Sequence, residues 1–91
     1  MKNKNISIGK VIEIKHTNIM ERYRNLGRDS GVSAYEIGAD YIIVKFSSTI
    51  RTYTYSYGKA GATHVENMKR LAQNGRGLNS YINQYVKYAY D

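Results

Sequence analysis

Residues 32–57 read VSAYEIGADYIIVKFSSTIRTYTYSY and carry the clearest pattern in the chain. Three runs in which apolar or aromatic residues alternate with polar ones cover residues 32–37, 41–46 and 50–57, with turn-like Gly38-Ala39-Asp40 and Ser47-Ser48-Thr49 between them. Such alternation is typical of strands, because successive side chains point to opposite faces of a sheet. The segment predicts a three-stranded antiparallel meander.

Two helices are predicted after the meander. Thr63 and Glu66 have the spacing of a capping box, and Gly75 suits the left-handed position that follows a helix. Beyond Gly75, apolar residues recur at the helical positions Leu78, Tyr81, Ile82, Tyr85, Val86 and Ala89. We therefore expect one helix that begins at Thr63 and a final helix over about residues 78–89.

The N-terminal part contains weaker signals. Asn18 with Glu21 resembles a capping box, and Gly27 lies where a helix would end, so a short basic helix is predicted over residues 19–26. Residues 6–16 fit helical spacing and alternation almost equally, and a strand, which would be the fourth, is slightly favoured. The fold class predicted is α+β: a three- or four-stranded antiparallel meander, two C-terminal helices and the short basic helix.

One domain is expected to span residues 1–91, because a chain of 91 residues suffices for a single core. Residues 1–29 would form a basic extension of a sheet-and-helix unit at 30–91.

With no cysteine, disulfides and cysteine-based metal sites are excluded, and His16 and His64 have no carboxylate at ligand spacing. The sequence has neither a catalytic constellation nor a membrane span or leader, so we expect a cytoplasmic protein that is no enzyme and needs no cofactor or metal.

The second half resembles the KTSC domain, a module found at the C-terminus of some lysyl-tRNA synthetases and as a stand-alone protein. The shared features are Tyr35-Glu36-Ile37-Gly38, the alternating Ile42, Val44 and Phe46, the pair Tyr53-x-Tyr55, Val65 and Met68, Gly75-Arg76, Asn79, Ile82 and Tyr88. Residues 58–62 replace a link that usually contains proline in the family, and residues 1–29 have no counterpart there. The resemblance implies an antiparallel sheet packed by C-terminal helices and a role in RNA binding, but no established activity.

Charge narrows the class of partner. The formal net charge is +7, of which residues 1–28 hold +5, with Arg22, Arg24 and Arg28 close together at the end of that segment. A cationic surface attracts polyanions through salt-sensitive forces, although a solubilising tail would have the same composition.

Three further features are candidates for binding. Arg51 shares one strand face with Tyr53, Tyr55 and Tyr57, and aromatic rings on such a face can stack nucleobases, although packing against the helices is favoured. Lys59 lies in the glycine-containing segment 58–61 before a predicted helix N-terminus, where anions are stabilised, but helix caps of this kind are usually structural.

Arg76 is the third candidate. It is flanked by Gly75 and Gly77, so a turn would present its guanidinium to phosphate, or the side chain would tie the turn to the sheet. We therefore predict a small basic binding protein for a phosphate-bearing polyanion, in the first place RNA or single-stranded nucleic acid. One alternative is a phage or mobile-element interaction or inhibitor module that binds an acidic protein partner. The other is a binder of a small nucleotide beside Lys59 and Arg76. A homodimer is compatible with each.

Overall fold

The computed structural model describes residues 20–28 and 30–91. The predicted strand at residues 6–16 and most of the basic extension lie outside these ranges. The helices and strands below therefore account for the sheet-and-helix unit and for the short segment that precedes it.

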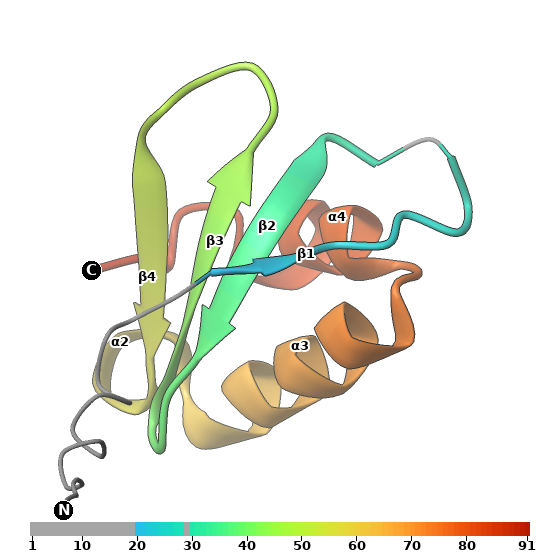
Figure 1. Ribbon diagram of the computed structural model, residues 1–91. Coiled ribbons are helices and arrows are strands. Elements are labelled where there is room, and N and C mark those ends of the chain that lie inside the picture. Colours follow the sequence, from blue (N-terminus) through green and yellow to red (C-terminus); the bar gives the residue numbers. More distant parts are fainter. Residues whose placement is uncertain (1–19, 29) are drawn as a thin grey trace, which may run out of the picture.

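The described residues form a four-stranded antiparallel sheet in the order β1-β2-β3-β4 (Figure 1). Its strands are β1 (Glu21–Arg22), β2 (Val32–Ile37), β3 (Tyr41–Phe46) and β4 (Thr52–Ser56). The bounds of β2 and β3 match the predicted runs, whereas β4 is shorter than the predicted 50–57. The meander is confirmed, and β1 extends it by one short strand.

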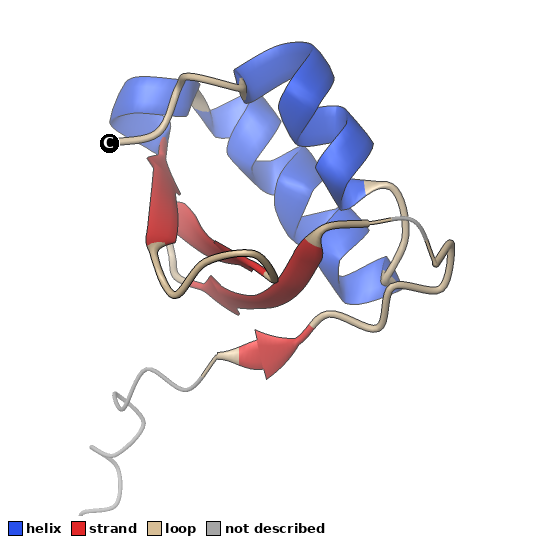
Figure 2. Ribbon diagram, turned by 90° about the horizontal axis from the view of Figure 1, so that it is seen from above, coloured by secondary structure: helices blue, strands red, loops and turns tan. Residues whose placement is uncertain are grey.

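The helices cover one face of this sheet (Figure 2). The helix α3 (Ala62–Asn74) buries Val65, Met68 and Ala72, which lie on one stripe at helical spacing. After the turn at Gly75, α4 (Leu78–Tyr81) continues directly into the π-helical segment η2 (Ile82–Val86). The two C-terminal helical elements were thus correctly predicted.

The core lies between the helices and the inward face of the sheet. Ile42 and Val44 of β3 are fully buried, and their cross-strand partners on β4 are Tyr55 and Tyr53. Alternation along β3 placed Ile42 and Val44 on one face, and the structure shows that this is the buried face. No helix in the described part of the chain is long and apolar enough to cross a membrane.

The helix predicted over residues 19–26 is wrong. Glu21 and Arg22 pair with β2 instead, and the next residue, Tyr23, is buried in the core. The Tyr23 hydroxyl accepts a hydrogen bond from the backbone N–H of Leu78, at 3.2 Å. An eight-residue helix is marginal by itself, so strand pairing, burial of Tyr23 and satisfaction of a free amide at the start of α4 outweigh it.

Two predicted helix boundaries also need correction. The segment 58–61 is not an open loop, because residues Tyr57–Ala60 form a single helical turn, α2, and Gly61 rather than Thr63 precedes α3. The final helix ends at Val86 instead of residue 89, and the chain then returns to the edge of β4. There the backbone N–H of Asp91 donates to the Thr54 carbonyl at 2.7 Å.

Candidate nucleic-acid interface

The predicted tyrosine row does not form an open stacking surface. Tyr55 is only 1% exposed, Tyr53 is half-buried, and both lie on the face that the helices cover. Tyr57 is exposed but belongs to α2, because β4 ends at Ser56. The interpretation as core packing therefore holds for Tyr55, while Tyr53 occupies the boundary between core and solvent.

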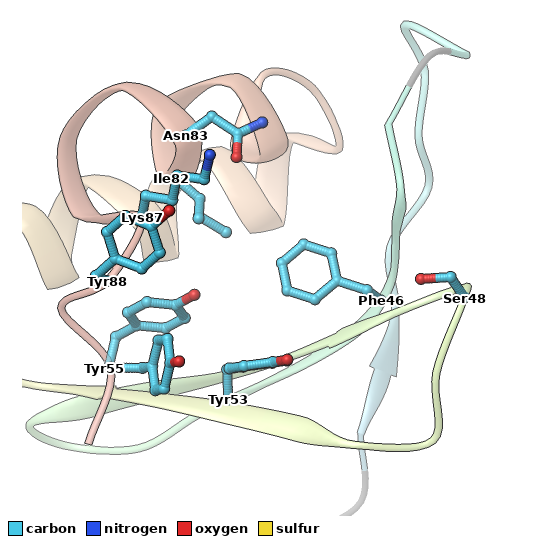
Figure 3. A pocket seen from close by; sticks show the side chains of 9 residues that line it. Phe46, Ser48, Tyr53, Tyr55, Ile82, Asn83, Lys87 and Tyr88 are labelled. Carbon is cyan, nitrogen blue, oxygen red and sulfur yellow. The ribbon is translucent and has the colours of Figure 1, made fainter.

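That boundary contains a pocket with a volume of about 300 Å³ (Figure 3). We call it the aromatic pocket; its lining residues are Phe46, Ser48, Tyr53, Tyr55, Ile82, Asn83, Lys87, Tyr88 and Tyr90. The sheet supplies one wall and the end of η2 with the returning tail supplies the other. Aromatic carbon and a few polar groups in one concave site are typical of small-ligand binding.

The rings of the aromatic pocket are held by edge-to-face packing. The ring centroids of Phe46 and Tyr53 lie 5.7 Å apart, and those of Tyr53 and Tyr90 lie 4.8 Å apart, with interplanar angles near perpendicular. Such pairs are favoured by the opposite charges of ring face and ring edge. The tail residue Tyr90 is thereby fixed against β4, which closes one side of the pocket.

Arg51 brings a cation to this group of rings. Its guanidinium carbon lies 4.8 Å from the ring centroid of Tyr53 and 5.9 Å from that of Tyr90. Lys87 also lines the pocket, with its ammonium 5.5 Å from the ring centroid of Tyr88. Within residues 20–28 and 30–91 neither cation pairs with a carboxylate, so both charges remain available to an anion.

Burial raises the pKa of Tyr55, which lines the aromatic pocket. Desolvation, followed by the nearby Tyr53 and Tyr90, raises the pKa of Tyr55 from 10.0 to about 12. The Tyr55 phenol therefore keeps its proton well above physiological pH and is able to donate a hydrogen bond.

The structure brings Arg24 and Arg76 together at the C-terminal end of α3, and we call this second site the arginine corner. The Arg24 guanidinium donates to the Gln73 carbonyl in the last turn of α3, and the Leu26 N–H donates to the Gly75 carbonyl at 2.7 Å. These bonds satisfy carbonyls that a helix end would leave free. Both arginines are exposed, but Arg24 holds the segment after β1 against α3, whereas the Arg76 side chain makes no hydrogen bond to the described residues.

The other predicted cations are dispersed. Arg22 is exposed on β1, and Arg28 is exposed in the following turn with a φ of 67°. Lys59 belongs to α2, at the opposite end of α3 from Arg76, and 13 helical residues separate the two by about 20 Å. A small nucleotide beside both Lys59 and Arg76 is therefore excluded by the geometry.

Sequence reasoning missed Lys87, Tyr88 and Tyr90. A helix predicted to residue 89 would have placed Lys87 and Tyr88 on a helical surface, not opposite β4. The alternation of Tyr88, Ala89 and Tyr90 is the signal that could have indicated a turn back to the sheet.

His64 belongs to a polar cluster and not to a metal site. Its Nδ1 lies 2.7 Å from the Tyr81 hydroxyl, which also accepts a hydrogen bond from the Asn67 amide at 3.0 Å. Across the described ranges, no three His, Cys, Asp or Glu side chains are grouped so as to hold a metal ion.

Comparison of the chain with protein-family models, curated proteins and solved structures finds no match. The resemblance to the KTSC domain therefore stays a prediction.

Proposed function

We propose that the protein binds single-stranded nucleic acid, with RNA as the first candidate. One observation carries the proposal: Arg51 and Lys87 flank an aromatic pocket, and neither is paired with a carboxylate of the described residues. The net charge of +7 adds long-range attraction for a polyanion.

Stacking and charge are the two interactions that single strands require. Base stacking on aromatic side chains contributes about 1–3 kcal/mol per base, and cations beside the rings contact the phosphates. A duplex keeps its bases stacked in its interior, so a concave pocket favours an unpaired base. The preference for RNA over DNA rests on the resemblance to the KTSC domain.

Fluorescence anisotropy with a labelled 12-nucleotide RNA tests the proposal. We expect micromolar or tighter affinity, with the logarithm of the binding constant falling linearly with the logarithm of salt concentration. Arg51→Gln and Lys87→Gln should each weaken binding roughly tenfold, because each removes a phosphate contact next to the rings. Absence of binding to both RNA and single-stranded DNA at about 50 mM salt would refute the proposal.

Arg70→Gln is the matched control, because Arg70 is an exposed cation on α3 that does not line the pocket. It removes the same charge, and among the described residues the Arg70 guanidinium donates to the neighbouring Asn67 side chain. A loss of affinity equal to that of Arg51→Gln would show that overall charge, not the aromatic pocket, drives binding.

A second candidate, an acidic protein partner, is favoured by one observation at the arginine corner. Leu26 is 48% exposed, and it lies between Arg24 and Arg28 in the sequence. An apolar side chain among cations is a common anchor at protein interfaces. Retention of a protein by the wild type, but not by Leu26→Glu, after nuclease treatment of a lysate would favour this candidate.

A further inference from the structure

The Tyr55 hydroxyl is a buried polar group of the aromatic pocket whose hydrogen-bond partner is not accounted for by the described residues. The residue is 1% exposed, yet no group within residues 20–28 and 30–91 makes a hydrogen bond to its hydroxyl. Buried tyrosine hydroxyls usually have a partner, because an unpaired polar group in a desolvated place is costly. Since Tyr55 lines the pocket, the missing partner can come from whatever enters it (Figure 3).

The surroundings restrict what that partner is. Phe46, Tyr53 and Tyr90 offer ring faces and edges, which suit a flat aromatic ligand. Asn83 lines the same pocket and adds an amide donor and acceptor. At about 300 Å³ the volume lies at the small end of ligand pockets. One nucleobase with its sugar is therefore accommodated, whereas a stack of several bases is not.

We infer that the aromatic pocket holds a single unpaired nucleobase, and that the Tyr55 hydroxyl donates a hydrogen bond to a ring nitrogen or carbonyl oxygen of that base. The inference rests on the proposed function as the source of the nucleotide. Arg51 and Lys87 then lie where the phosphates leave the pocket on either side. The protein would thus anchor a strand at one nucleotide and hold the rest by charge.

Tyr55→Phe isolates the hydroxyl, since the ring and its packing remain. Two probes are used. Binding of the four ribonucleoside 5′-monophosphates is measured by NMR titration, and binding of the 12-nucleotide RNA is measured by fluorescence anisotropy. We expect a three- to tenfold loss of affinity for the preferred monophosphate and for the RNA, with an unchanged salt slope because no charge is removed. The free variant should unfold at the same temperature or higher, because an unpaired buried hydroxyl has been removed.

Tyr35→Phe serves as the matched control: it also removes a hydroxyl from a half-buried sheet tyrosine, but on β2, at a residue that does not line the pocket. It should change affinity less than twofold. A lower unfolding temperature for Tyr55→Phe with unchanged affinity would overturn the inference, because the hydroxyl would then have a structural role.

The two probes separate this inference from the proposed function. If the RNA binds but Tyr55→Phe binds it equally well, the inference fails and the function stands. If monophosphates bind through Tyr55 but no RNA or single-stranded DNA binds, the function fails and the pocket remains a nucleotide site. If neither probe binds, both are overturned.

Discussion

Arg24 and Arg51 carry the same charge, but the structure gives them different surroundings. At the arginine corner, Arg24 donates to a main-chain carbonyl at the end of α3 and lies against the backbone of Gly75. At the aromatic pocket, Arg51 lies over the rings of Tyr53 and Tyr90 and contacts no carboxylate of the described residues. The difference teaches that net charge overstates the binding surface, because part of it holds the fold together.

The largest expected effect concerns the structural role of the arginine corner. Gly75 has a φ of 75°, and a Cβ there would lie 2.9 Å from the Cβ of Arg24. We expect Gly75→Ala to lower the free energy of unfolding by about 2–4 kcal/mol, from the left-handed conformation and the close contact together. Urea unfolding at neutral pH measures this.

Gly77→Ala is the control for Gly75→Ala. Gly77 is also left-handed, with a φ of 83°, but a Cβ there would only reach ordinary contact with Leu71, at 3.7 Å. It should cost about 1–2 kcal/mol. Equal losses at the two glycines would show that the approach of Arg24 to the turn has no energetic weight.

The next effect belongs to the aromatic pocket and appears at high pH. The pKa of Tyr55 is raised from 10.0 to about 12, so the folded protein holds this proton more tightly than the unfolded chain does. Its contribution to stability is complete below pH 10 and is lost as the pH rises towards 12, by about 2–3 kcal/mol in total. Tyr55→Phe should lose correspondingly less stability between about pH 9 and about pH 11.5, as measured by urea unfolding. Parallel curves for the two proteins would contradict the assignment.

The smallest expected effect is the difference in unfolding free energy between substitutions of the two arginines of the arginine corner. Arg24→Ala should lower the free energy of unfolding by about 0.5–1 kcal/mol, because it removes a charged donor from the C-terminal end of α3. Arg76→Ala removes an exposed side chain from the adjacent turn and should change stability by less than about 0.5 kcal/mol. Chemical denaturation of both variants under one set of conditions checks this order. The reverse order would assign the structural role to Arg76.

Local pattern was sufficient for the elements that bury one regular face. The alternation around Ile42 and Val44 gave the sheet, and the stripe of Val65, Met68 and Ala72 gave α3. It was insufficient where a distant partner determines the conformation. Tyr23 lies in extended chain because its hydroxyl meets the amide of Leu78, 55 residues away, and nothing near Tyr23 encodes that contact.

The candidate site was predictable to a similar degree. Arg51, Tyr53 and Tyr55 were identified from one strand face, and all three lie at the aromatic pocket. Lys87 and Tyr90 were missed because the tail turns back after Val86, a change that depends on packing against β4 rather than on helix propensity. Arg24 and Arg76 were predicted as separate features, because their proximity depends on the position of α3.

The return of the tail also bears on assembly. An edge strand presents unpaired backbone groups to which another strand can add. On β4 the Thr54 carbonyl already accepts from the backbone of Asp91, and the Ser56 hydroxyl donates to the Asp91 carboxylate at 2.7 Å. A homodimer that joined two sheets through β4 would first have to displace its own tail, and with it the Tyr90 wall of the aromatic pocket. Addition of a second strand at the β4 edge and an intact aromatic pocket are therefore mutually exclusive.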